Sequence, residues 1–164
     1  MAQLSIAGDT SGAITISAPS VAGTNTLTLP ASTGTVLTTG SPQSGGVIQV
    51  VSATYSSATS TSSASYVDTG LTATITPKFS TSKIIIITQQ NGSKTGSDTS
   101  IDSQLVRSST VLTNLTTIGD TGSTGTGSGT FSFAYLDSPA TTSATTYKTQ
   151  FKNRNGVGTV TVQS

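Results

Sequence analysis

The chain has 164 residues, of which 8% are charged, with a formal net charge of +1. This length suits one ordinary domain plus an appendage. So few charges provide no electrostatic footprint for nucleic acid or for an anionic membrane surface, so neither is expected as a partner. The chain start carries no charged segment followed by a long apolar one, so neither a secretory signal nor membrane insertion is expected.

The composition also removes most catalytic and metal-binding chemistry. His and Cys are absent, and all six acidic residues are aspartates, which leaves no imidazole base, thiolate nucleophile or Cys/His metal set. Asp98, Asp102 and Asp120 lack the spacing of a calcium loop. We interpret the aspartates as loop caps instead, because Asp beside Ser, Gly and Thr bonds its own backbone. We therefore predict a protein that is not an enzyme, with no catalytic, cofactor-binding or metal site and no cofactor.

The hydroxyl residues indicate the fold class. The chain has 35 Thr and 28 Ser, and Thr, Val and Ile dominate the runs that carry apolar residues. These β-branched side chains favour strands, and no segment sustains the 3.6-residue period of an amphipathic helix. We predict an all-β protein whose hydroxyls lie on the wet faces of its sheets.

A short N-terminal segment precedes the main domain. Apolar residues alternate with small polar ones at residues 4–6 and 14–16, and Gly, Asp and Ser between them are turn residues. Two further short elements are expected at residues 24–30 and 35–37. The segment has one thin apolar face and no second layer, so it cannot fold alone. We predict that residues 1–45 form an anchoring or shaft segment with its linker, and that residues 46–164 form the head.

The head begins with an apolar stretch, residues 47–51, and continues through Ser-rich and Thr-rich sequence to residue 65. Further on, Phe131, Phe133 and Tyr135 alternate with small residues and are predicted to lie in the core. About eight strands at regular intervals predict a two-sheet β-sandwich that is jelly-roll-like.

The run Ile84–Ile87 is apolar on both faces. It predicts either an interior strand of the sandwich or a strand that a neighbouring subunit covers. Exposed, such a run would favour aggregation, and Lys83 stands at its start as a charged gatekeeper.

The remaining connections are read from their turn residues. Residues 91–97 and 119–129 are predicted to be polar or Gly-rich loops. Asn155-Gly156 predicts a hairpin between residues 145–151 and 158–163. The basic cluster of Lys148, Lys152 and Arg154 is interpreted as the solvated edge of that hairpin, because Lys on an edge strand deters pairing.

Several motifs resemble a known family. Residues 23–31 (GTNTLTLPA) and 34–37 are similar to a segment near the start of many tailed-bacteriophage virion proteins. Five pieces of the head resemble domains of the same phage proteins, namely residues 66–71, 75–77, 82–84, 136–139 and 146–148. The resemblance touches both halves of the chain, and because its motifs define no chemical site it assigns no site residue.

The resemblance implies a virion structural protein, a homotrimer that is held to the capsid or tail by its N-terminal segment and projects the head outward. Both a tail fibre and a capsid fibre or decoration protein stay open. The alternative is a receptor- or glycan-binding module for host adsorption, acting through the loops at 91–97 and 119–129. Tyr55, Tyr66 and Tyr147 could stack on sugars, although packing in the core or at its rim is favoured for them.

Overall fold

The computed structural model describes residues 3–7, 10–17, 20–21, 23–24, 26, 31, 46–97, 99–118 and 125–163. The chain divides into two compact units, Met1–Gly46 and Val47–Ser164, which we take separately. All regular structure within the described residues is β-strand, so the prediction of an all-β protein is confirmed. The elements expected at 24–30 and 35–37, and most of the linker, lie outside the described residues.

The first unit contains one antiparallel strand pair. Strand β1 spans Gln3–Ala7 and β2 spans Ala13–Ser17, with Ile6 opposite Ile14. Ile6, Ile14 and Ile16 are all exposed. A two-stranded hairpin is marginal in water without a layer against its apolar face.

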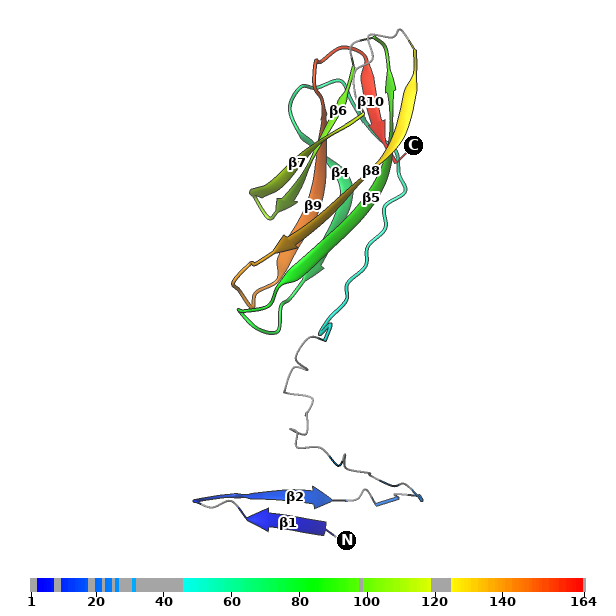
Figure 1. Ribbon diagram of the computed structural model, residues 1–164. Helices are drawn as coiled ribbons and strands as arrows, with labels where there is room; N and C mark the ends of the chain where they lie inside the picture. Colours follow the sequence, from blue (N-terminus) through cyan, green and yellow to red (C-terminus); the bar gives the residue numbers. More distant parts are fainter. Residues whose placement is uncertain are drawn as a thin grey trace. The chain divides into compact units, whose positions relative to one another are not determined.

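The second unit is a sandwich of two four-stranded sheets (Figure 1). One sheet has the order β3-β10-β5-β8 and the other β4-β9-β6-β7. Their bounds are β3 Thr59–Thr61, β4 Val67–Ile75, β5 Ile84–Thr95, β6 Ile101–Arg107, β7 Thr110–Ile118, β8 Gly127–Asp137, β9 Thr145–Asn153 and β10 Thr159–Val162.

The strand pairing is nested. β6 pairs with β7, β5 with β8, β4 with β9, and β3 with β10, all antiparallel. The head is therefore one long ribbon with its tip at the β6–β7 turn. Winding this ribbon so that β10 also pairs with β5, and β6 with β9, produces the two sheets.

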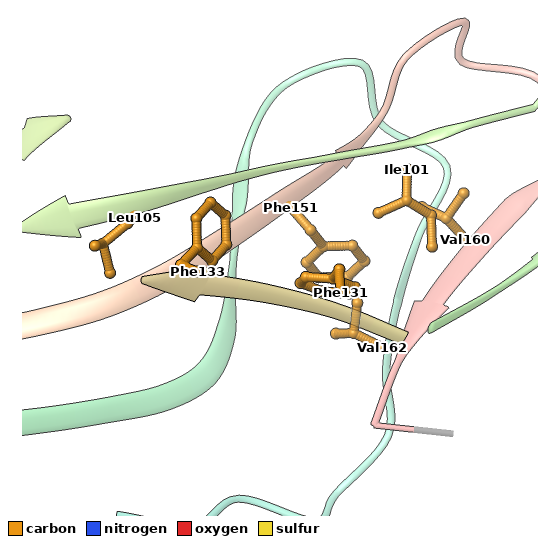
Figure 2. Close-up of a cluster of buried hydrophobic side chains, with 7 residues drawn as sticks. All are labelled: Ile101, Leu105, Phe131, Phe133, Phe151, Val160 and Val162. Carbon is orange, nitrogen blue, oxygen red and sulfur yellow. The ribbon is translucent and has the colours of Figure 1, made fainter. Parts of the chain in front are cut away.

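The core lies between the sheets and draws on both of them (Figure 2). β8 and β10 contribute Phe131, Phe133, Val160 and Val162, while β6 and β9 contribute Ile101, Leu105 and Phe151. The rings of Phe131 and Phe133 meet edge to face, with their centroids 6.4 Å apart. The prediction that these two residues lie in the core is confirmed, and Tyr135, also predicted there, is partly buried and packs against the core cluster.

Hydroxyl groups are also buried, and one pair of them forms a hydrogen bond with each other. Thr69 and Thr149 are both buried, and their hydroxyl oxygens lie 2.7 Å apart in a hydrogen bond. The pair joins β4 to β9. Because each hydroxyl of this pair has a partner, their hydrogen bond offsets the cost of taking them out of water.

The predicted hairpin at Asn155-Gly156 is wrong. β9 lies in one sheet and β10 in the other, so residues 154–158 cross between sheets. The side chain of Asn153 organises the crossing: its Nδ2 donates to the carbonyl of Val157 at 2.8 Å, and its Oδ1 accepts from the amide of Gly156 at 3.1 Å. Gly156 has a left-handed φ of +67°, which glycine adopts readily. The turn nevertheless carries the chain from one sheet to the other, so the strands on its two sides do not pair.

The predicted loop at 91–97 is also wrong over most of its length. β5 continues to Thr95, and its residues from Gly92 to Thr95 pair with β10 on one side. Of the Gly-rich stretch, Gly127–Gly129 belongs to β8, and residues 119–124 lie outside the described residues.

Candidate functional site

An apolar strip lies on the outward face of the sheet that contains β5 and β8. Ile85 is 65% exposed, Ile87 74% and Leu136 62%. Ile85 stands opposite Leu136 across the two strands, and Ile87 stands opposite Ala134, which is also exposed. We call these four residues the apolar strip.

The rest of this outward face is polar but uncharged. Gln89 stands opposite Ser132 and Asn91 opposite Thr130, and all four side chains are exposed. Lys83 precedes the strand, and its Nζ donates to Ser138 Oγ at 2.7 Å. The face therefore offers a partner apolar contact and amide or hydroxyl hydrogen bonds, with a single charge, Lys83, at its end.

The apolar strip contains the outward-facing half of the run Ile84–Ile87. β5 lies between β10 and β8, but β10 pairs only with Gly92–Thr95, so among the described strands the run Ile84–Ile87 pairs with β8 alone. Ile84 and Ile86 face inward and are half-buried, whereas Ile85 and Ile87 face outward and are exposed. Within one chain, therefore, only one of the two apolar faces is covered.

A second apolar surface precedes the sandwich in the sequence. Residues 46–58 have no regular secondary structure and all are exposed, with Val47 at 83% and Val50 at 81%. Ile48 and Val51 are also large hydrophobic residues that remain exposed. Within the described part of the chain, none of residues 46–58 makes a hydrogen bond. We call residues 47–55 the strap.

One residue ties the strap to the sandwich. Gly70 has a φ of +91° in β4, and a Cβ built on it would lie 2.3 Å from the Tyr55 ring. The ring therefore lies directly on the glycine backbone. Gly70 falls within the register shift of the β4–β9 pair between Asp68 and Thr72, where a bulge leaves room for this contact.

The outward face of the other sheet carries charges that are paired within the chain. Lys148 Nζ on β9 donates to Asp68 Oδ2 on β4 at 2.9 Å, and Gln150 Nε2 donates to Asp68 Oδ1 at 2.7 Å. The hydrogen bonds from Lys148 and Gln150 hold the pKa of Asp68 below its ordinary value, against a smaller opposing effect of burial.

A second charge cluster lies on the same sheet. Arg154 donates to both oxygens of Asp102, at 2.6 and 3.1 Å. Lys152 Nζ lies 3.9 Å from Asp102 Oδ2 and 4.9 Å from the centroid of the Tyr66 ring. The reading of Lys148, Lys152 and Arg154 as a hairpin edge is wrong, because β9 lies between β4 and β6 and each of these cations is paired.

A third ion pair connects the two sheets. Arg107 Nη1 on β6 donates to both carboxylate oxygens of Asp137 on β8, at 2.8 and 2.9 Å. The hydroxyl of buried Tyr147 donates to Asp137 Oδ2 at 2.6 Å. Burial, then the hydrogen bond to Asp137 and its charge, raise the pKa of Tyr147 well above its ordinary value.

These contacts correct the loop-cap interpretation of the aspartates. Asp68, Asp102 and Asp137 lie in strands and bind cationic side chains. Asp98 and Asp120 lie outside the described residues. Among the residues that the structure describes, no group of acidic side chains is placed to hold a metal ion.

The three tyrosines considered for sugar stacking have other contacts. Tyr147 is buried, Tyr66 lies under Lys152, and Tyr55 lies on Gly70. The sequence predicts residues 47–51 only as the apolar start of the head, and does not identify the strap as a separate surface. The sequence signal for the strap is the stretch VIQVV, because the residues after it do not alternate between apolar and polar side chains as a strand of the sandwich would.

Comparison of the chain with protein-family models, with curated protein sequences and with solved structures gives no match. In the described part of the chain, no helix has the length and hydropathy needed to cross a membrane.

Proposed function

We propose that this chain is a non-enzymatic structural protein of a bacteriophage virion, a homotrimeric fibre-like protein of the tail or the capsid. The observation that carries the proposal is the pair of uncovered apolar surfaces, the strip and the strap, on an otherwise well-packed sandwich. Contiguous exposed apolar residues on a folded domain mark a site of protein association. A fibre head needs such surfaces because its copies assemble side by side.

The nested strand pairing supports the finer description of the head as a jelly roll. In that architecture one antiparallel ribbon is rolled into two sheets, and it recurs in viral structural proteins. The strand orders β3-β10-β5-β8 and β4-β9-β6-β7 follow this winding.

The positions of the phage-like motifs also support the proposal. Asp137, from the motif at 136–139, accepts a hydrogen bond from Tyr147, from the motif at 146–148. Asp68, from the motif at 66–71, pairs with Lys148. The pair Asp68–Lys148 thus joins motif pieces that are far apart in the sequence, as expected when a resemblance reflects a shared fold.

The first unit supplies the proposed attachment to the particle. Its strand pair exposes Ile6, Ile14 and Ile16 and has no second layer among the described residues. We propose that this strand pair binds capsid or tail proteins of the same virion, which would provide the second layer. The glycan-binding alternative has no specific observation in its favour, since Tyr66 and Tyr147 are occupied by contacts within the chain.

Immunogold electron microscopy of virions from the phage that encodes the chain tests the proposal. We expect label on the capsid or tail, and we expect a variant lacking residues 1–45 to fold but to leave the particles unlabelled. Labelled cell debris with bare virions would contradict the virion location. Sedimentation of the full chain should give three times the 16.3 kDa chain mass, and a stable monomer would contradict the trimer.

A further inference from the structure

We infer that the strap of one copy covers the apolar strip of a neighbouring copy of the same chain. This inference rests on the proposed homo-oligomer and names the surfaces that would hold it together. The strap would contribute Val47, Ile48, Val50 and Val51, and the strip Ile85, Ile87, Ala134 and Leu136.

The two surfaces match in chemistry. Residues 46–58 contain no charged residue, and the outward side chains of β5 and β8 described above are apolar, amide or hydroxyl. Contact between these residues therefore desolvates no charge as long as Lys83, at the end of the strip, stays in water; desolvating a charge is a large cost of burying polar surface. The charged outward face of β4, β9 and β6 would not suit the strap, because it offers ion pairs that are already satisfied.

The strap is built as an extended apolar ligand. Its backbone amides and carbonyls make no hydrogen bonds with the described residues of its own chain. Such a stretch can bind by its side chains and its free backbone groups, as extended segments do when they add to a sheet. β-branched Val and Ile lose little freedom in an extended conformation.

The positions of the two surfaces favour a neighbour over the chain itself. Tyr55 fixes one end of the strap on β4, and Thr59 in β3 follows, with its Oγ1 donating to the carbonyl of Thr69. β3 and β8 are the opposite edges of their sheet, and the strip lies on the β5–β8 side. In the single chain both surfaces remain exposed.

A surface at one edge that fits a different surface at the other edge makes a head-to-tail contact. Such a contact closes into a ring when the rotation between copies permits. Three copies, each giving a strap and receiving one, form the proposed trimer with every strip covered. Strip packed on strip would instead produce a two-fold dimer.

The test uses two full-length variants, Val50→Cys and Ile87→Cys, which are suited to it because the chain has no native cysteine. Both positions are exposed, so neither change removes a buried contact. One variant carries a size tag, the two are co-expressed, and a short bis-maleimide is added. We expect a mixed cross-linked species that contains one copy of each variant.

Each variant alone and the pair Val50→Cys with Thr74→Cys serve as controls, because exposed Thr74 faces outward on the charged sheet. We expect cross-linking from none of the three. Dimers formed by Ile87→Cys alone would show strip against strip and overturn the inference. A trimer by sedimentation without the mixed species would also overturn it, while leaving the proposed function intact. A monomer would remove both.

A second measurement does not depend on cross-linking geometry. The double change Ile85→Ser and Ile87→Ser should weaken self-association at least tenfold, because two apolar side chains no longer leave water on assembly. Val111→Ser, at an exposed apolar position on β7 in the other sheet, is the control and should leave association unchanged. Equal association of the double variant and the wild type would count against the strip.

Discussion

The outward faces of the two sheets are opposites. On β4, β9 and β6 the charged side chains of Asp68, Lys148 and Asp102 are paired within the chain. On β5 and β8 the outward side chains are uncharged, and Ile85 and Ile87 are exposed without cover. Both faces belong to one ribbon wound on itself, so the difference is not one of architecture.

The contrast indicates what each face is for. Ion pairs that neighbouring strands complete need no second molecule, and in water they contribute little to stability. Large apolar side chains in water lose the free energy that burial would provide, about 1.5–3 kcal/mol for each one fully buried. The charged pairs of the first face are complete within one chain, whereas the second face is left uncovered and, in our proposal, would be covered by assembly.

The largest effect is expected at Asp137, whose ion pair with Arg107 joins the two sheets in the interior of the sandwich. Asp137→Ala leaves buried Tyr147 and the Arg107 guanidinium without their partner. Breaking a buried ion pair costs about 3–5 kcal/mol, and we expect a loss of that size in urea unfolding. The matched change Asp68→Ala, on the exposed face, should cost less than about 1 kcal/mol. Equal losses would mean that burial does not separate the two pairs.

The attachment of the strap is tested next, at Gly70. Gly70→Ala forces a side chain into a φ of +91° and against the Tyr55 ring. We expect a loss of about 1–3 kcal/mol in the free energy of unfolding. In a double-mutant cycle, Tyr55→Ala should recover the part that comes from the ring. Strict additivity of the two changes would show that the ring does not lie on Gly70 in solution.

Alkaline pH tests the buried hydrogen bond between Tyr147 and Asp137. The pKa of Tyr147 is raised on folding, so the unfolded chain loses its proton first, near the ordinary value of 10.0. The associated stability is complete below pH 10 and is lost as pH rises toward the raised pKa, by at most about 1.4 kcal/mol per pH unit. Between pH 9 and about 12, the free energy of unfolding measured in urea should fall less steeply with pH for Tyr147→Phe than for the wild type. Parallel profiles would contradict the shift.

The smallest effect is expected at Asp68, on the charged face. Its pKa is lowered on folding, so its contribution is present above the ordinary value of 3.8 and is lost as pH falls through the lowered pKa. Because the carboxylate is exposed, we expect about 0.2–1 kcal/mol, decreasing with added salt. Asp68→Asn should remove this part of the acid profile, as measured by thermal unfolding from pH 5 to about 2. An unchanged profile would mean that the pair is not formed in solution.

Local pattern predicted the elements that depend on side-chain period. The alternation at Phe131 and Phe133 placed both in the core, because the two faces of a strand see different environments. Turn chemistry was less informative. Asn155-Gly156 supplied the expected left-handed turn, yet the flanking strands joined different sheets. The turn that closes the β6–β7 hairpin, Ser108-Ser109, carries no such signal, although Ser108 has a φ of +52°.

What the sequence determined by itself was the all-β class, the alternating core strands and the doubly apolar run at Ile84–Ile87, because these follow from composition and from a period of two. Only the tertiary structure decided which side of that run is covered, and that the cations of β9 meet Asp68 and Asp102. Both depend on the order of strands in the sheets. That order is set by contacts between residues far apart in the chain, which no local pattern encodes.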